Sequence, residues 1–557
     1  MSHPDIPDAS ANSPVTSAAR RLAFGDLAAA IATLAALVGV ALVLVARGGV
    51  YYSEWAQDNF IPLEGALHVL RGQWPHRDFV TPVGSLWYVI NAIPGLVMPL
   101  SARLIVWANL IVALTGAIAT LVVCRRKLPH WLACLCAFYV GLVAMSPRQV
   151  GESLHMISNN ASYNRYCWSL ICAIAMASLL PAPAGTARRR DPIDGIVVGL
   201  LIAICFYIKI TYAAAGVGFV GLALITSRGP AAWRFGMWAG IVATGTVVAA
   251  AVLTHDLPGY IADMKTAVAV LPDASRSGQL LLLLIWSLPG MILVVLLSLR
   301  ATALPGKNLG AFGPGAWAGL LTVGAGLAIG VQNHPEPENP LLPVGLMVGW
   351  IVSRQHHTGP VRSSTRFGYA VIGAAFAIMM AGDLGAVAWT TIAPVETSAN
   401  TGWLRDTRVS DLRIGIEQTG PKFPDKTQPQ NDGEIFGVLN EAVVLLRPHL
   451  QGRHDARVLP FNWNNPFPVL LGLPPIRHEA AWWDPERTFN AKLAPAPHAL
   501  LDGVDYILIR TEYRKYLAER TMWDVYGALV LHDFKPVGHS HHWTLWARKT
   551  CAVRSLC

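Results

Sequence analysis

Charged residues are scarce in this 557-residue chain. They make up 14% of the sequence, against roughly 25% in soluble domains, while hydrophobic residues make up 53% and the mean hydropathy is +0.42. This deficit excludes a fully water-soluble enzyme. The formal net charge is +9, but the cations stand in short stretches between apolar runs, where they orient a membrane protein. The positive charge therefore does not indicate a nucleic-acid partner.

Cysteines are few and lack metal-type spacing. The chain has eight of them, and six lie in or beside apolar runs, where cysteine acts as a small hydrophobic residue. No pair gives a zinc pattern. Cys551 and Cys557 lie in the tail and could pair in an oxidising compartment.

A cleavable leader is also lacking. Residues 1–24 are polar, rich in Pro, Ser and Ala, and contain Arg20-Arg21 near their end. They show no small-residue cleavage site after a short apolar core. We expect a disordered cytoplasmic tail here.

Apolar runs comparable in length to a bilayer core fill most of residues 25–391. Eleven such runs are found at 26–46, 102–124, 128–146, 166–182, 193–209, 211–227, 235–254, 280–299, 315–332, 340–353 and 367–391. They predict a polytopic α-helical membrane domain with about 11 transmembrane helices. The shorter apolar segment 84–99 contains Pro94 and is predicted to lie along the membrane interface.

The basic residues predict the orientation of these spans. With the amino terminus in the cytoplasm, the cytoplasmic stretches hold 15 Lys and Arg residues and the opposite loops hold 7, in agreement with the positive-inside rule. An odd number of spans then puts the first loop, 47–101, and everything after about residue 392 on the outer face. The prediction is a multi-pass protein of the inner (cytoplasmic) membrane.

From residue 392 to 557 the composition becomes that of a soluble domain. A helical stretch at 434–450 is followed by strand-like segments at 456–463 and 504–510, a helix at 513–530 and a final strand at 542–549. This order predicts a small extracytoplasmic α/β domain.

Two carboxylates stand out in the first outer loop. Asp58 lies near its start, and Asp78 follows 20 residues later, after a helix-like stretch closed by Gly72 and Pro75. Such carboxylates at the membrane surface are suited to holding and deprotonating an acceptor hydroxyl. Each has a structural alternative: Asp58 could cap the following helix, and Asp78 could pair with Arg77 or with the histidine before it.

The motifs of this loop resemble a known family. Asp58-Asn59, then Leu-Arg-Gly at 70–72, then Pro-His-Arg-Asp-Phe at 75–79 resemble the first loop of the GT-C superfamily of membrane glycosyltransferases. Protein mannosyltransferases and lipid A aminoarabinose transferases are similar. Members often carry Asp-Glu and Pro-Tyr-Arg-Asp-Phe at these places, whereas this chain has Asn59 and His76.

The resemblance implies an activity. The expected donor is a polyprenyl-phosphate sugar, with transfer at the outer (periplasmic) face and inversion at the sugar carbon. The acceptor would be a glycan, lipid or protein. In displacement from a lipid phosphate the leaving group is already a stable anion, so one base suffices, unlike glycoside hydrolysis with its two carboxylates. Asp58 is the predicted base and Asp78 a second catalytic candidate.

A departing phosphate also needs cations around it. The candidates on the outer side are Arg148, Arg165 and Lys209. Lys209 lies at the end of an apolar run, where an unpartnered charge is costly, and the alternative is that it reaches the interface as a simple anchor. Arg165 has the same alternative.

Acceptor or sugar contacts are predicted in two places. His334, Glu336 and Glu338 stand at the mouth of a span, and Trp463 lies in an Asn- and Trp-rich stretch of the tail. A solvated turn and core packing are the respective alternatives. No cofactor is expected to be required; the acids permit a divalent metal without indicating one.

Two other functions remain open at this stage. A transporter or flippase for a lipid-linked sugar would carry ionisable residues near the membrane midplane, and here only Lys209 and Asp383 qualify. A non-catalytic membrane scaffold or sensor would use the outer domain to bind glycan. Charged groups gathered in the outer loops favour the enzyme.

Overall fold

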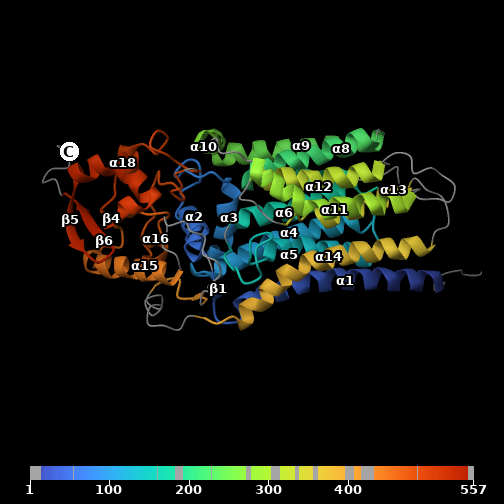
Figure 1. Cartoon of the computed structure of the whole chain (residues 1–557), viewed down its shortest axis with the longest axis horizontal. Coiled ribbons are helices and arrows are strands. Elements are labelled where there is room, and N and C mark those ends of the chain that lie inside the picture. The colour runs from blue at the N-terminus through green and yellow to red at the C-terminus, as the bar shows by residue number, and fades with distance from the viewer. Residues whose placement is uncertain are drawn as a thin grey trace, which may run out of the picture.

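The computed structural model describes residues 14–53, 55–159, 161–181, 192–227, 229–270, 277–302, 314–332, 338–355, 362–395, 407–415, 432–485 and 487–549. A long helical bundle forms one part of the molecule and a smaller α/β domain the other (Figure 1). Helices α2, Phe60–Leu70, and α3, Ser85–Ala92, belong to the first loop and lie between the two parts (Figure 1).

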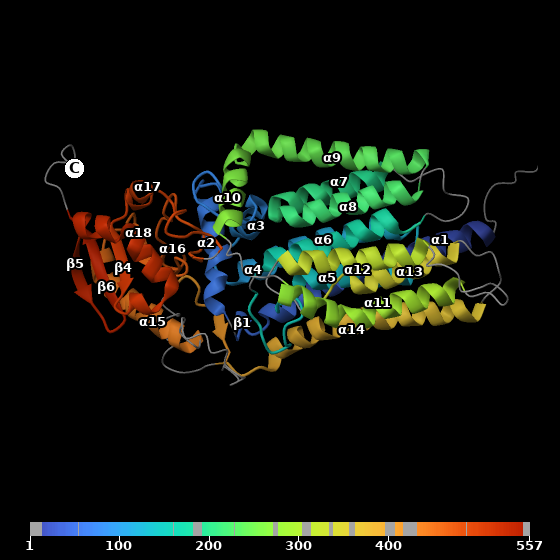
Figure 2. The same cartoon turned by 45° about the horizontal axis from the view of Figure 1, so that its top comes forward.

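Helices coincide with all eleven predicted apolar runs in the described chain. They are α1 Pro14–Val45, α4 Arg103–Cys124, α5 His130–Met145, α6 Ser162–Leu179, α7 Pro192–Ile208, α8 Ile210–Ser227, α9 Pro230–Thr254, α11 Ser277–Thr302, α12 Pro314–Gln332, α13 Leu342–Gln355 and α14 Arg362–Ile392. The sequence did not predict α10, Leu257–Val270, which turns across the end of α9 (Figure 2).

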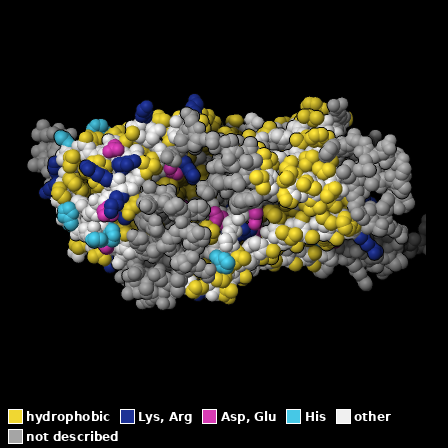
Figure 3. Space-filling model, in the orientation of Figure 1, with side chains coloured by type: hydrophobic (Ala, Val, Ile, Leu, Met, Phe, Trp, Pro, Cys, Tyr) yellow, Lys and Arg dark blue, Asp and Glu magenta, His cyan; other side chains and the backbone are white. Residues whose placement is uncertain are grey.

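Four helices within the described residues are both long and apolar enough to cross a bilayer: Gly25–Val45, Arg103–Cys124, Pro230–Thr254 and Arg366–Ile392. Six further helices are apolar but shorter. Hydrophobic side chains cover much of the bundle, whereas charged side chains gather over the α/β domain (Figure 3). Such an apolar exterior is unfavourable in water, and it defines the chain as a membrane protein.

Helix α1 begins earlier than predicted. Residues 14–24 were expected to belong to a disordered tail, but the helix starts at Pro14. Proline suits the first helical position, and the stretch that follows is rich in Ala, Arg and Leu, which are good helix formers. Hydropathy locates the apolar part of a helix and not its polar extension.

The first loop folds into short elements between the bundle and the domain. Strand β1, Val50–Tyr52, pairs in parallel with β2, Leu412–Ile414, and is followed by the 3-10 turn η1, Ala56–Asn59, and helix α2, Phe60–Leu70. The segment predicted to lie at the interface forms α3, Ser85–Ala92, and η2, Ile93–Leu96. Leu96 and Val97 at its end are largely exposed, as an interfacial helix requires.

A four-stranded sheet forms the centre of the tail domain. Its strands are β3 Val458–Phe461, β4 Tyr506–Arg510, β6 Trp543–Arg548 and β5 Phe534–His539, in that order across the sheet. Strands β3 and β4 are parallel, and the β4/β6 and β6/β5 pairs are antiparallel.

Alternate residues of these strands pack on opposite faces, as the period of a strand requires. Val458 and Leu508 belong to the hydrophobic core that includes α15, Asp432–Leu446. Leu459 and Ile507 belong to a separate core that includes α18, Leu517–Asp533. The domain is therefore a sheet between two helical layers, an arrangement that the prediction of a small α/β domain did not specify.

Four helices and strands described between residues 392 and 557 were not predicted. They are strands β2 and β5 and the short helices α16, Phe467–Leu471, and α17, Pro497–Leu501. Pro536 and Gly538 interrupt β5 and shift its register on β6, so no alternating pattern marks it in the sequence.

The contact between α2 and α3 gives a test of loop packing. A methyl group on Gly65 of α2 would come within 1.9 Å of the Tyr88 ring in α3. Tyr88 is fully buried, and its hydroxyl is 2.7 Å from Thr81 Oγ1, so the ring is held in place. We expect Gly65→Ala to cost about 1–3 kcal/mol through overpacking, measured as a lower thermal midpoint in detergent.

The matched control is Gly437→Ala in α15, where an added methyl would meet nothing within 4 Å. There alanine should leave stability unchanged or raise it by about 0.5–1 kcal/mol. Equal midpoints for wild type and Gly65→Ala would contradict the described packing of α2 on α3.

Candidate functional site

Asp58 lies in η1, at the junction between the first loop and the tail domain. Its carboxyl is 8% exposed, and its Oδ1 has no hydrogen-bond partner in the described structure. The predicted alternative, capping of the next helix, is wrong: the N-cap residue of α2 is Asn59, and no side chain caps that helix. A buried carboxyl oxygen without a partner costs free energy, and such atoms often mark a functional site.

The tail surrounds this carboxyl. Burial raises the pKa of Asp58 from 3.8 to about 7; the indole of Trp463 lies beside the carboxyl, short of hydrogen-bond geometry, and opposes the increase. Asp484 adds to the increase and Arg487 opposes it. The Asn464 amide donates to the Gln57 carbonyl at 2.7 Å, which fixes this part of the tail against η1.

Trp463, predicted to contact acceptor or sugar, is thus next to the predicted base. The structure brings these two residues together from segments far apart in the sequence. The N–H edge of an indole and a carboxyl therefore lie side by side at this junction.

Asp78 is engaged in holding the loop. Its Oδ2 accepts hydrogen bonds from the Trp74 amide at 2.7 Å and from the Arg77 guanidinium at 2.9 and 3.1 Å. Burial acts to raise its pKa, but the Trp74 amide and Arg77 outweigh it and lower the pKa below 3.8. These contacts favour the structural alternative for Asp78.

Main-chain hydrogen bonds join the loop beyond Asp78 to the tail. The amide of His478 donates to the Asp78 carbonyl, the Val80 amide donates to the Glu479 carbonyl at 2.9 Å, and the Ala481 amide donates back to Val80 at 2.9 Å. Val80 and Ala480 form a parallel bridge. The tail therefore continues the loop like an added strand.

Two buried acids lie at this junction. Glu64 of α2 and Glu479 of the tail are 3% and 2% exposed, and one oxygen of each has no partner in the described structure. The other Glu479 oxygen accepts from the Asn465 amide at 3.1 Å. Burial raises the pKa of both carboxyls, and the charge of Glu479 adds to the effect on Glu64.

His68 does not neutralise these acids. Its Nε2 lies 4.0 Å from Glu64, but burial lowers its pKa to about 4, so the imidazole is neutral near pH 7. Its Nδ1 is 2.6 Å from the Gln73 side-chain oxygen. Ionisation of these carboxyls would therefore weaken the junction.

Lys209 lies between α7 and α8, at the end of the bundle that faces the first loop. Its Nζ donates to Asn164 Oδ1 at 2.9 Å and sits 5.0 Å from the centre of the Tyr163 ring. Both partners begin α6. A lysine side chain that only extended to the membrane interface would not need these contacts. The Lys209 side chain is therefore positioned by the protein as well as by the interface.

The first loop covers this lysine. The Gly84 amide donates to the Ile208 carbonyl at 2.9 Å, and a methyl on Gly84 would meet the Tyr207 carbonyl oxygen at 2.1 Å. The Trp87 indole donates to Ser162 Oγ at 2.9 Å. Only glycine permits this approach, which brings α3 against the start of α6.

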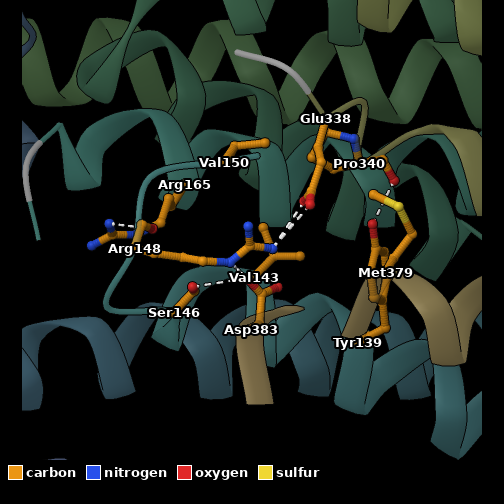
Figure 4. A pocket seen from close by; sticks show the side chains of 10 residues that line it. All are labelled: Tyr139, Val143, Ser146, Arg148, Val150, Arg165, Glu338, Pro340, Met379 and Asp383. Atoms are coloured by element: carbon orange, nitrogen blue, oxygen red, sulfur yellow. Dashed lines mark hydrogen bonds and ion pairs between the residues drawn. The ribbon is translucent and has the colours of Figure 1, made fainter. Parts of the chain in front are cut away.

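Arg148 and Arg165 lie together in the wall of a small pocket (Figure 4). Arg148 is buried and donates to Asp383 at 2.9 Å and to Glu338 at 3.0 and 3.2 Å. Arg165 donates to the Arg148 carbonyl at 2.9 Å and to Asn159 at 3.3 Å. Two carboxylates already form ion pairs with Arg148, so its positive charge is neutralised within the protein.

The pocket among these side chains is small. Its volume of about 10 Å³ is the space that one water molecule needs. Glu338, predicted to contact acceptor, instead pairs with Arg148 in this wall. His334 and Glu336 lie outside the described residues. Among the residues that are described, no three His, Cys, Asp or Glu side chains are grouped to hold a metal ion.

The structure thus gathers the three predicted cations around the amino end of α6, while Asp58 sits with Trp463. No described contact joins Asp58 directly to the cations. The two groups are linked by the chain from β1: the Ser53 amide donates to the Ile157 carbonyl at 2.9 Å, and the phenol of Tyr52 lies near Arg165 and Asn159.

Sequence reasoning missed the contacts of α10 with the first loop. Asp263 accepts from the Thr81 amide at 3.1 Å and lies 2.7 Å from His76 Nδ1. Asp256 accepts from the Trp74 indole at 3.1 Å and from Ser85 at 2.7 Å. Acids in this short outer segment were visible in the sequence, but nothing there indicated their partners.

No family model matches the chain, and no curated protein sequence does. Among solved structures the chain is similar to ArnT from Cupriavidus metallidurans bound to undecaprenyl phosphate, with 13% identity, a TM-score of 0.47 and coverage of 93% of this chain and 97% of that chain. It is also similar to the archaeal oligosaccharyltransferase AglB from Archaeoglobus fulgidus in complex with an inhibitory peptide and a dolichol-phosphate. That match has 12% identity, a TM-score of 0.37 and coverage of 94% and 74%.

The buried acid pair predicts how stability varies with pH. Because the folded pKa values of Glu64 and Glu479 are raised, their contribution is fully present below the usual value of 4.5 and is lost as pH rises through the folded values. Glu479→Gln keeps the shape and cannot ionise. We expect its thermal midpoint to fall less than that of wild type between about pH 5 and about pH 8.5.

The control is Asp502→Asn, which changes an exposed acid of the same domain. It should follow the wild-type pH dependence. A Glu479→Gln variant with the same fall in midpoint as wild type would show that the acid pair does not limit the stability of the junction.

Proposed function

We propose that the chain is a membrane glycosyltransferase of the GT-C kind. It would move a sugar from a polyprenyl-phosphate donor to an acceptor at the membrane face that carries the tail domain, with inversion and with Asp58 as base. The observation that supports this most is the buried Asp58 carboxyl, with one oxygen unpartnered, on the loop that bears the GT-C-like motif.

Asp58 has the properties of a general base. A base acts best when its pKa lies near the working pH, and burial brings the pKa of Asp58 to about 7. The acceptor hydroxyl would donate to this carboxylate and lose its proton as the hydroxyl oxygen attacks the sugar carbon. The bond from that carbon to the phosphate oxygen breaks, and the lipid phosphate leaves as an anion.

Lys209 is the cation that we assign to the donor phosphate. Its Nζ donates to Asn164 Oδ1 and lies near the Tyr163 ring, at the amino end of α6, whereas Arg148 is balanced by two carboxylates. An ammonium group at the end of the bundle that faces the first loop can strengthen its interaction as charge develops on the leaving phosphate. Arg165, which donates to the Arg148 carbonyl and to Asn159, would position the start of α6.

The tail supplies the acceptor side. Trp463 packs beside Asp58, and a pyranose presents an apolar face to an aromatic ring and hydroxyls at its edges. The acceptor would therefore enter between the tail and the first loop. A flippase for a lipid-linked sugar would use the same donor contacts but would have no need of Asp58.

Asp58→Asn tests the base. We expect at least about a 100-fold loss of transfer to a reconstituted acceptor, the usual contribution of a general base. In the wild type, activity should rise with pH and level off above about 7, because the carboxylate must be ionised to act. Radiolabelled polyprenyl-phosphate sugars in proteoliposomes give the measurement.

Folding is controlled separately in this test. Asn removes a charge that is costly to bury, so the variant should be no less stable than wild type at about pH 8. Asp502→Asn should transfer at the wild-type rate. Full transfer by a folded Asp58→Asn protein would remove Asp58 as the base, and movement of donor across the bilayer without transfer would favour the flippase.

Lys209→Met tests the donor site. Loss of a charged hydrogen bond to phosphate is worth about 1.5–3 kcal/mol, so we expect the KM for the donor to rise by about 10- to 100-fold. Lys265→Met, which removes an exposed cation from α10, is the control and should leave it unchanged. An unaltered KM in Lys209→Met would return this residue to the role of an interface anchor.

A further inference from the structure

A second pocket lies at the end of the bundle away from the tail domain. Helix α13 ends there at Gln355 and α14 begins at Arg362. The other end of α14 is tied to the start of the first loop, because Arg47 donates to the Ala393 carbonyl. Figures 1 and 2 show α14 running between these two ends. The pocket is thus separated from Asp58 and Lys209 by the length of the bundle.

Trp350, Ile351, Arg354 and Tyr369 line this pocket, whose volume is about 170 Å³. Trp350 is fully buried and rests on Gly368, where an added methyl would lie 2.1 Å from its ring. The glycine lets α14 approach the indole closely, so the ring forms a fixed wall. The volume is below the 300–1,000 Å³ typical of pockets for whole small molecules, and it suits a compact head group.

Arg354 gives the pocket its charge. The guanidinium carbon lies 5.9 Å from the centre of the Trp350 ring, and the side chain is half-buried. In the part of the chain that the structure describes, no carboxylate lies within ion-pair distance of it. A planar guanidinium held over an aromatic ring still presents donors at its edge, in the geometry that binds phosphate oxygens.

Aromatic side chains border the same region. Trp131 of α5 meets Tyr369 edge to face, with ring centres 6.1 Å apart, and is half exposed. Phe367 is 44% exposed near the start of α14. Trp and Tyr are enriched where a membrane protein crosses the level of the lipid head groups, so this pocket opens at that level.

We propose that this pocket binds the phosphodiester head group of an anionic glycerophospholipid from the leaflet opposite the tail domain. Arg354 would hold the phosphate, Trp350 and Tyr369 would enclose the head group, and the acyl chains would lie along α13 and α14 in the bilayer. Basic pockets between helices are a known means of lipid recognition. The inference does not depend on the proposed glycosyl transfer.

Lipid binding to the delipidated full-length protein in detergent tests the proposal. Native mass spectrometry counts lipids bound when phosphatidylglycerol is added. Arg354→Met should bind it about tenfold more weakly than wild type, since losing a charged contact costs at least about 1.4 kcal/mol. Arg366→Met, which removes an exposed cation from the same end of the bundle, should bind like wild type.

Two further ligands, diacylglycerol and inorganic phosphate, distinguish binding of a phospholipid from binding of acyl chains alone or of a free anion. Diacylglycerol, which has no phosphate, should not bind to this pocket, and inorganic phosphate at the same concentration should not displace phosphatidylglycerol, because it lacks the chains that the bilayer-facing helices hold. Equal binding by wild type and Arg354→Met, or an equal loss in Arg366→Met, would overturn the proposal. So would displacement by inorganic phosphate, which would assign the pocket to a free anion.

Arg354→Lys is the second variant, for the case in which Arg354→Met does not fold. It keeps the charge but loses the planar contact with Trp350 and the paired donors. We expect weaker phosphatidylglycerol binding than in wild type, and wild-type binding would contradict the assigned geometry. Transfer activity is not part of this test, so its outcome is independent of the role of Asp58.

Discussion

The candidate site depends on main-chain hydrogen bonding between the first loop and the tail. Residues 78–80 pair with 478–481, and β1 pairs with β2, so the tail holds the loop at its start and again past its middle. These bonds use backbone groups that must be satisfied in any buried segment. The side chains are left to form the site, and Asp58 is buried because the tail covers it.

Burial by the tail gives the acids of one loop different protonation states. Burial raises the pKa of Asp58 to about 7 and also raises that of Glu64, whereas Asp78, which accepts from the Trp74 amide and from Arg77, has a lowered pKa. Near pH 7, Asp78 is an anion, whereas Asp58 can be either protonated or ionised. Only an acid of the last kind can accept a proton and release it again within one reaction cycle.

Much of the fold could be predicted from the sequence, because a bilayer demands long apolar helices and a sheet packed on both faces demands short apolar strands. The eleven runs and the buried strands β3 and β4 follow from these two patterns. The acid pair of Glu64 and Glu479 could not be predicted, since its members are far apart in the sequence and each looks like an ordinary surface acid. Strand β5 was missed for a local reason, namely Pro536 and the register shift beside it.

The fate of the cations shows why composition alone does not identify a binding site. Lys209, Arg148 and Arg354 all stand near the end of an apolar run. Arg148 forms ion pairs with Asp383 of α14 and with Glu338, which precedes α13. Its positive charge is therefore neutralised within the protein. Arg354 lies over the Trp350 ring instead, with no carboxylate within ion-pair distance among the described residues. A cation paired with a carboxylate gains less from an added anion than a cation held by neutral groups. The two arginines therefore have similar places in the sequence and different electrostatic surroundings, and only the folded structure distinguishes them.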